Sequence, residues 1–117
     1  MEKYENETIA AIATALSDSG IGIVRISGDN AIDIVDNVFR SASGKRILTK
    51  VQSHTIHYGY IVDKDENVID EVMTAVMKAP RSYTMEDTVE INCHGGVLVM
   101  QKVLDTLLQA GARLAEP

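Results

Sequence analysis

The spacing of apolar residues constrains the fold of this chain more than any other feature, because it changes several times between the period of a strand and that of a helix. Period-two or continuous apolar segments predict strands over residues 7–14, 20–28, 54–62, 67–80 and 88–95. Apolar residues at helical spacing predict helices over Asn30–Arg40 and from Gly96 to Gly111. This order predicts an α+β fold, in which two helices pack on a mixed or antiparallel sheet.

The connections are predicted from turn and breaker residues. The turn-rich segment 63–66 lies between the third and fourth strands and predicts a β-hairpin. The fourth strand is a continuous apolar run that Pro80 ends, which is typical of a central position in a sheet. Asp29 precedes the first helix as a cap-like carboxylate, and the small, polar and basic segment 41–53 predicts an exposed connection.

The composition is that of one ordinary domain with a single modest core. Of the 117 residues, 45% are hydrophobic and 24% are charged. Aromatic residues make up only 4%, without tryptophan, and the formal net charge is -6. Nucleic-acid affinity depends on basic residues that displace counterions and, for single strands, on aromatic stacking. The composition therefore argues against a free-standing RNA reader.

The cysteine content and the apolar runs bear on the compartment. Cys93 is the only cysteine, so the chain can form no internal disulfide, and a reducing cytoplasm is the simplest location. No apolar run approaches the roughly 20 residues that span a bilayer. We therefore expect a cytoplasmic protein that does not associate with a membrane. The last residues, up to Pro117, follow closely on the second predicted helix, and we expect the chain to be a fragment of a longer protein.

The stretch EINCHGG, which begins at Glu90, combines a carboxylate, a thiol and an imidazole. On a strand, Cys93 and His94 point to opposite faces, so they cannot form a catalytic dyad, and we interpret Cys93 as a small buried hydrophobic residue. His94 shares a face with Glu90, but zinc-type sites need three or four strong ligands. The other histidines, His54 and His57, show no recognisable ligand spacing. We therefore predict no catalytic residue and no metal site in this chain.

The glycine pair Gly95 and Gly96 opens the second predicted helix and leaves two interpretations open. Backbone N–H groups at a helix N-terminus favour an anion. Glycines also simply permit a sharp turn from strand to helix. Neither GxGxxG nor GxxxxGK(S/T) occurs in the sequence, so nucleotide binding by this segment is not supported.

Two charged residues stand in strand segments where a charge needs a partner or solvent. Arg25 shares a strand face with isoleucines, and Glu90 lies in mid-strand between apolar neighbours. A carboxylate can accept two parallel hydrogen bonds from a guanidinium or from the edge of a pterin, and a guanidinium can bind a carboxylate or a carbonyl. An internal ion pair between Arg25 and Glu90, or two solvent-facing side chains, stays open as the alternative.

The second predicted helix is apolar around much of its circumference. Val97, Leu98, Val99 and Met100 follow one another in the sequence and cannot all face one core. Some of this surface should meet a partner, and we expect a homodimer.

Several sequence motifs, in this order along the chain, resemble the N-terminal domain of the tRNA-modification GTPases of the MnmE, or TrmE, family. These motifs are TIAAIAT, GIGIVRISG, VIDEV, APRSYTMED, VEINCHGG and GARLAEP. The resemblance covers essentially all of the chain after Glu7. It implies that residues 1–117 are the N-terminal tetrahydrofolate-binding and dimerisation domain of a longer protein, whose helical and GTPase domains are missing from this chain.

The resemblance implies a fold similar to that of folate-binding aminomethyltransferases and a bound tetrahydrofolate derivative, 5-formyltetrahydrofolate in known cases. Two folate-binding positions of the family correspond to Arg25 and Glu90, and a further lysine contact lies beyond Pro117. The resemblance also implies a homodimer that, with the flavin- and NADH-dependent partner MnmG, adds an aminomethyl-type group to the wobble uridine of tRNA. GTP, magnesium and potassium belong to the missing GTPase domain, and tRNA binds through other domains.

The chain departs from the family pattern in two loops. Ala15 stands where proline is common, and Met85 stands where glycine is common. These departures bear on loop conformation and folate affinity more than on the fold.

Other functions stay open beside the folate-binding one. They are a purely structural dimerisation domain without a ligand, a free-standing folate-dependent module similar to an aminomethyltransferase, and an independent thiol or metal enzyme. By itself, the chain is expected to show neither GTPase activity nor tight tRNA binding, because it contains no P-loop motif and is net acidic.

Overall fold

The computed structural model describes residues 7–13, 22–80 and 85–115. The order of elements in these residues is β1 (Ile9–Ile12), β2 (Gly22–Ser27), α1 (Ala31–Val38), β3 (Phe39–Ser41), the 3-10 turn η2 (Leu48–Lys50), β4 (Thr55–Val62), β5 (Val68–Met77), β6 (Thr88–Cys93), α2 (Val97–Gln109) and β7 (Arg113–Leu114). The five predicted strands and two predicted helices are confirmed. The short elements β3, η2 and β7 are additional.

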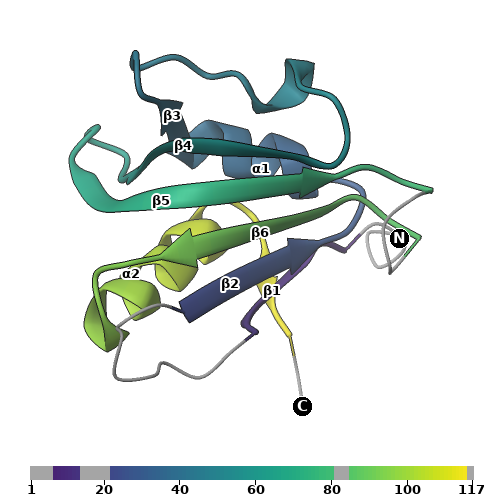
Figure 1. Ribbon diagram of the computed structural model, residues 1–117. Helices are drawn as coiled ribbons and strands as arrows, with labels where there is room; N and C mark the ends of the chain where they lie inside the picture. The colour runs from purple at the N-terminus through teal and green to yellow at the C-terminus, as the bar shows by residue number, and fades with distance from the viewer. Residues whose placement is uncertain (1–6, 14–21, 81–84, 116–117) are drawn as a thin grey trace.

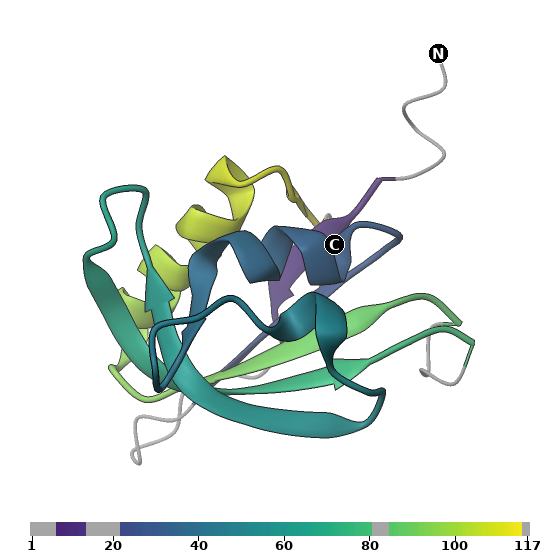
Figure 2. The same ribbon diagram turned by 90° about the horizontal axis from the view of Figure 1, so that it is seen from above.

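The strands form one sheet in the order β3-β4-β5-β6-β2-β1-β7. Neighbouring strands are antiparallel except β1 and β7, which are parallel. Both helices lie on the same side of the sheet, as Figure 1 and Figure 2 show, and among the described residues no layer covers the opposite face. The predicted α+β class is therefore confirmed, with a mixed sheet that is open on one side.

β4 and β5 form the predicted hairpin, and β5 lies inside the sheet between β4 and β6. In the connecting turn, the amide of Glu66 donates to the carbonyl of Asp63 at 2.9 Å, and Glu66 takes a left-handed φ of 65. The carboxylate of Asp63 accepts from the amides of Asn67 and Asp65. These hydrogen bonds, that of Asn67 first, lower the pKa of Asp63 because they favour its charged form.

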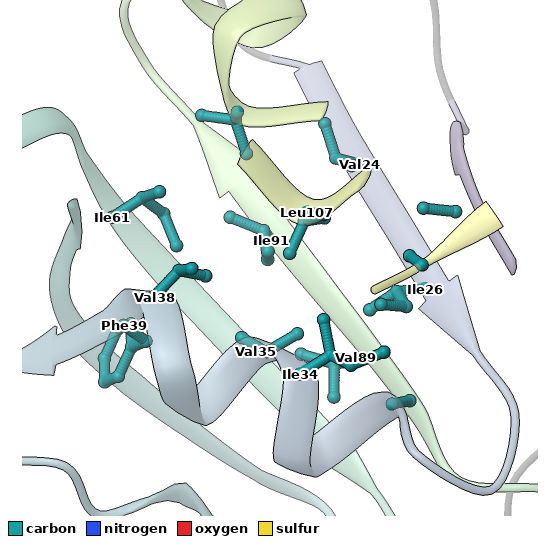
Figure 3. Packing of buried hydrophobic residues seen from close by; sticks show 14 of the residues in the cluster. Val24, Ile26, Ile34, Val35, Val38, Phe39, Ile61, Val89, Ile91 and Leu107 are labelled. Atoms are coloured by element: carbon teal, nitrogen blue, oxygen red, sulfur yellow. The ribbon is translucent and has the colours of Figure 1, made fainter. Parts of the chain in front are cut away.

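The hydrophobic core lies between the two helices and one face of the sheet. Figure 3 labels its central members, Val24, Ile26, Ile34, Val35, Val38, Phe39, Ile61, Val89, Ile91 and Leu107. A fully buried Val, Ile or Leu contributes about 1.5–3 kcal/mol of hydrophobic stabilisation. Because side chains alternate along a strand, Arg25 and Glu90, which lie between core residues in the sequence, face the open side of the sheet.

The first helix ends earlier than its apolar spacing predicts. The spacing continues to Arg40, but α1 ends at Val38, and Phe39 begins β3 with an extended backbone. Phe39 pairs with Ile61 of β4, and its fully buried ring lies so close to Gly59 that an added Cβ there would come within 2.5 Å of Cζ. The predicted end at Arg40 is therefore wrong, because burial against a distant strand outweighs a local helical signal.

The start of the first helix also differs from the prediction. Asn30, rather than Asp29, occupies the N-cap position, and it makes no side-chain capping hydrogen bond. The amide of Asn30 donates to Oγ1 of Thr8 at 3.0 Å. A residue that precedes β1 therefore satisfies a backbone group at the start of α1.

The segment 41–53 is not exposed throughout, as its polar composition predicts. It contains η2, and the side chain of Leu48 is fully buried. Asp36 of α1, which is only 5% exposed, accepts a hydrogen bond from the amide of Leu48 at 3.0 Å and pairs with Arg46. The expectation of an exposed connection is therefore wrong at Leu48, because Asp36 holds the loop against the helix.

The second helix stops where the sequence predicts, at Gly111. This residue has φ 125, and its amide donates to the carbonyl of Leu108, while the amide of Ala112 donates to that of Leu107. These two bonds form a Schellman motif, in which a left-handed glycine ends the helix. Within the described residues, neither helix has the length and apolar character that crossing a membrane requires.

Candidate functional site

Arg25 and Glu90 lie directly opposite each other on the adjacent strands β2 and β6. The Nε and Nη2 atoms of Arg25 both approach Oε2 of Glu90, at 2.8 and 2.7 Å. The side chain of Arg25 is 41% exposed and that of Glu90 is 15% exposed. The fold thus brings together the two residues that the sequence singles out, and the internal ion pair that the sequence leaves open is present.

Small residues flank this ion pair in the same cross-strand row. Ala11 of β1 lies opposite Arg25, and Ala75 of β5 lies opposite Glu90. Because alanine side chains are small, they project little from the open face of the sheet on both sides of the two charges. A planar ligand group could therefore approach the charges along the sheet surface.

A pocket of about 310 Å³ adjoins Arg25, at the low end of the size range of small-molecule sites. It is lined by Ile9, Ala10, Ala11, Ile12, Ala13, Arg25, Ser27 and Ala115. Its walls are therefore mainly aliphatic, with the guanidinium of Arg25 as the charged group. Glu90 lies on the other side of Arg25 and does not line the pocket.

An internal carboxylate occupies the amide groups at the turn between β6 and α2. Asp70 of β5, which is 8% exposed, accepts hydrogen bonds from the amides of His94 at 2.8 Å and Gly95 at 3.3 Å. Gly96 follows at the N-cap with φ 94, a conformation that glycine adopts at little cost. The two glycines thus shape a strand-to-helix turn, and an aspartate of the same chain satisfies two of the amides that an anion would use.

Reasoning from the sequence missed this role of Asp70. The signal was present, because Asp70 lies two and six residues before Val72 and Val76 and so shares their buried strand face. A carboxylate at such a position needs hydrogen-bond partners.

Cys93 and His94 lie on opposite sides of β6, as predicted. Cys93 has no exposed surface, and burial, with a smaller effect of the nearby negative charge of Asp70, raises the pKa of its thiol to about 12. His94 is exposed, and its Nδ1 donates to the backbone carbonyl of Glu71 at 3.0 Å. A thiol that stays protonated is a poor nucleophile, so this arrangement does not support cysteine chemistry.

The described ranges contain no group of three or more His, Cys, Asp or Glu side chains that could hold a metal ion.

The two loop departures from the family pattern, Ala15 and Met85, differ in whether the structure describes them. Ala15 lies outside the described residues, whereas Met85 is 68% exposed and has φ 64. A side chain at a left-handed position is strained where glycine is not, so Met85 stands at a position that glycine would occupy without strain.

The fold and this site together define an α+β domain whose open sheet face carries an arginine–glutamate pair beside an aliphatic pocket. Comparison with known proteins shows a match of residues 8–117 to the family model described as "GTP-binding protein TrmE N-terminus". The chain therefore belongs to the TrmE N-terminal family, and the resemblance drawn from its sequence motifs is confirmed.

Relatives of this chain carry the name tRNA modification GTPase MnmE. The protein from Lachnoclostridium phytofermentans is 59% identical over 113 residues, which cover 97% of this chain and 24% of the relative. The protein from Geobacillus kaustophilus is 57% identical over 114 residues, with the same two coverages. The protein from Thermoanaerobacter pseudethanolicus is 55% identical over 112 residues, which cover 95% of this chain and 24% of the relative. The chain thus spans about a quarter of the length of these relatives.

Proposed function

We propose that this chain is the tetrahydrofolate-binding and dimerisation domain of a tRNA-modification GTPase. The observation that carries the proposal is the contact between Arg25 and Glu90 on the open sheet face, beside a pocket of about 310 Å³, in a chain of the TrmE N-terminal family. The ligand is a tetrahydrofolate derivative similar to 5-formyltetrahydrofolate, and the fold is similar to that of folate-binding aminomethyltransferases.

Each of the two residues has its own role in this proposal. The carboxylate of Glu90 accepts the paired N–H groups at the edge of the pterin, and the partly exposed guanidinium of Arg25 binds a carbonyl or carboxylate of the ligand. The ion pair between them orients both groups before the ligand arrives. The aliphatic walls beside Arg25 supply apolar contact for the rest of the ligand.

The names of the relatives support a wider role for the longer protein to which the domain belongs. With the flavin- and NADH-dependent protein MnmG, it adds an aminomethyl-type group to the wobble uridine of tRNA in the cytoplasm. Hydrolysis of GTP, with magnesium and potassium, takes place in its GTPase domain. The folate bound by this chain represents the one-carbon donor.

Calorimetric titration with 5-formyltetrahydrofolate tests the proposed site. Glutamine keeps one acceptor oxygen but sets its NH2 group against the second pterin N–H and removes the charge, so Glu90→Gln should weaken binding by about 2–4 kcal/mol, and Arg25→Ala by a similar amount. The titration is made with this chain and with a longer protein that continues past Pro117, because the resemblance places a further lysine contact there.

The pair of Arg40 and Glu66 offers a matched control, because it is a second arginine–glutamate ion pair remote from the pocket. Glu66→Gln breaks this pair, and Cys93→Ser changes a core side chain on β6, the strand that carries Glu90. Both variants should leave folate affinity nearly unchanged. Thermal unfolding of every variant checks that it folds. If the longer protein binds no folate, the purely structural dimerisation domain replaces this proposal. If Glu90→Gln folds and binds folate like the parent chain, the assignment of the site is wrong.

A further inference from the structure

A second group of side chains gathers on the open face of the sheet, away from Arg25. This tyrosine cluster consists of Tyr58 and Tyr60 of β4, Glu71 and Met73 of β5, and His94 at the end of β6. A hollow of about 220 Å³ lies within it, lined by Tyr58, Glu71, Val72, Met73 and His94. None of these residues lines the pocket beside Arg25.

The polar atoms of the tyrosine cluster offer mainly hydrogen-bond acceptors to a ligand. The hydroxyl of Tyr58 donates to Oε2 of Glu71 and accepts, at 3.5 Å, from the hydroxyl of Tyr60, which leaves a lone pair of the Tyr58 oxygen and those of the Tyr60 oxygen as acceptors. The Nδ1 atom of His94 donates to the carbonyl of Glu71, so Nε2 of the neutral ring is an acceptor. The carboxylate of Glu71 adds a negative charge. A donor-rich cation complements such a group.

The shape and the apolar surface of the tyrosine cluster favour a guanidinium over an ammonium. The rings of Tyr58 and Tyr60 lie edge to face, with centroids 5.8 Å apart, and Tyr58 is 42% exposed. A planar guanidinium can stack on an aromatic face and donate two parallel bonds to one carboxylate, which a lysine ammonium cannot do. Met73, 37% exposed, and Ile56, 63% exposed, offer apolar surface for the aliphatic part of an arginine side chain.

The size of the hollow points to a side chain of a partner protein as the occupant. Small-molecule sites measure roughly 300–1,000 Å³, and this hollow of about 220 Å³ is smaller and lies on an open sheet face. Within the described residues, a second copy of this chain is a poor source, because the arginines there already pair with carboxylates of their own chain; Arg81 lies outside these residues. These pairs are Arg25 with Glu90, Arg40 with Glu66, Arg46 with Asp36, and Arg113 with Glu7.

From the acceptor groups, the aromatic surface and the negative charge, we propose that the tyrosine cluster binds an arginine side chain that a different protein presents. The guanidinium stacks on Tyr58 and donates to Glu71 and to Nε2 of His94, while the methylene groups of the arginine contact Met73. This inference is independent of folate binding, because it involves neither Arg25 nor Glu90.

Nuclear magnetic resonance titration of this chain with N-acetyl-arginine amide tests the proposal. Signals of Tyr58, Met73 and His94 should shift together and saturate. N-acetyl-lysine amide should bind about tenfold more weakly, a difference of about 1.4 kcal/mol, because an ammonium cannot donate two parallel bonds to one carboxylate. Neutral N-acetyl-citrulline amide should cause no such shifts, because it carries no charge. Equal shifts with citrulline would overturn the proposal, because they would show that the charge is not recognised.

Two variants locate the binding, and one controls for net charge. Glu71→Gln should reduce arginine affinity about tenfold or more, in line with the loss of charged hydrogen bonds, and Tyr58→Thr should reduce it by removing the aromatic face. Asp105→Asn removes the same charge from an exposed position of α2 and should have no effect. Unchanged affinity in a folded Glu71→Gln or Tyr58→Thr variant would contradict the proposal. Concentration-dependent shifts of these signals in the ligand-free chain would instead identify a second copy as the occupant and overturn it.

Discussion

The thiol of Cys93 illustrates how burial of a single residue alters its chemistry. In the folded chain, burial raises its pKa from an ordinary value of 9.0 to about 12. An unfolded chain loses this proton near the ordinary value, whereas the folded chain keeps it. Folding is therefore favoured by this group below the ordinary pKa, and that contribution is lost as the pH rises from about 9 towards about 12.

We expect urea denaturation to show a free energy of unfolding that declines across this alkaline range. In Cys93→Ala the decline should be smaller, since the titrating thiol is absent, although the variant should also lose stability at neutral pH through a small cavity. The difference between the two pH profiles isolates the thiol from the lysines and tyrosines, which also titrate there. Identical profiles would show that the buried thiol does not contribute.

Met85 is a second residue whose local backbone conformation affects stability. Its φ of 64 is left-handed, which costs a residue with a Cβ roughly 1 kcal/mol or more. Met85→Gly should remove this strain but increase the entropy of the unfolded chain, so we expect a net gain of about 0.5–1 kcal/mol in the free energy of unfolding. Met85→Val, with a β-branched side chain at the same position, should lose stability in the same denaturant titration. A gain with valine would rule out strain as the explanation.

At the scale of elements, the pairing of β3 with β4 depends on the absence of a side chain at Gly59. A Cβ at this position would lie 2.2 Å from the carbonyl oxygen of Arg40 and 2.5 Å from the ring of Phe39. Neither neighbour can withdraw without breaking the strand pair or emptying part of the core. Gly59 therefore determines how closely β3 can approach β4.

We expect Gly59→Ala to lower the free energy of unfolding by about 1–3 kcal/mol, the usual cost of overpacking, or by more because one contact is with backbone. The double variant with Phe39→Leu should be less destabilised than the sum of the two single variants, because leucine lacks the ring that the new Cβ would meet. This relief should be partial, since the clash with the Arg40 oxygen persists. Denaturant titration of the three variants measures this coupling. Strictly additive effects would show that Phe39 and Gly59 do not restrict each other.

At the scale of the whole molecule, the exposed start of α2 bears on the proposed homodimer. Val97 is 55% exposed and Leu98 is 77% exposed, whereas Met100 is buried in the core. The apolar circumference predicted for this helix is therefore divided between a core face and a solvent-exposed face. An exposed apolar face at one helix end is a reasonable place for a symmetric contact between two copies.

Sedimentation analysis should show a dimer for the parent chain. Leu98→Asp should weaken it at least about tenfold, because a charge replaces apolar surface that each copy would bury. Gln101→Asp, which adds the same charge to an exposed position of α2, should leave the dimer intact. A parent chain that stays monomeric, or a Leu98→Asp dimer of unchanged strength, would contradict a contact through this face.

Local periodicity was sufficient for the main elements and for the faces of the strands. The alternation along each strand correctly separated Arg25 from Val24 and Ile26, and Glu90 from Val89 and Ile91, because strand geometry fixes the face of each residue relative to its own neighbours. The stop at Gly111 was equally local, since the left-handed conformation belongs to the residue itself. These features need no knowledge of distant parts of the chain.

The register between strands, and every contact that depends on it, was decided only by the tertiary structure. The sequence left open whether Arg25 faces Glu90, a ligand or solvent, because 65 residues separate the two positions and no periodicity relates them. The same holds for Phe39 against Gly59 and for Asp70 at the start of α2. A carboxylate, a glycine and an aromatic ring acquire their partners from the packing of strands that are distant in the sequence. This packing outweighs their local preferences because the hydrophobic free energy of many side chains buried together is larger than any single residue's propensity.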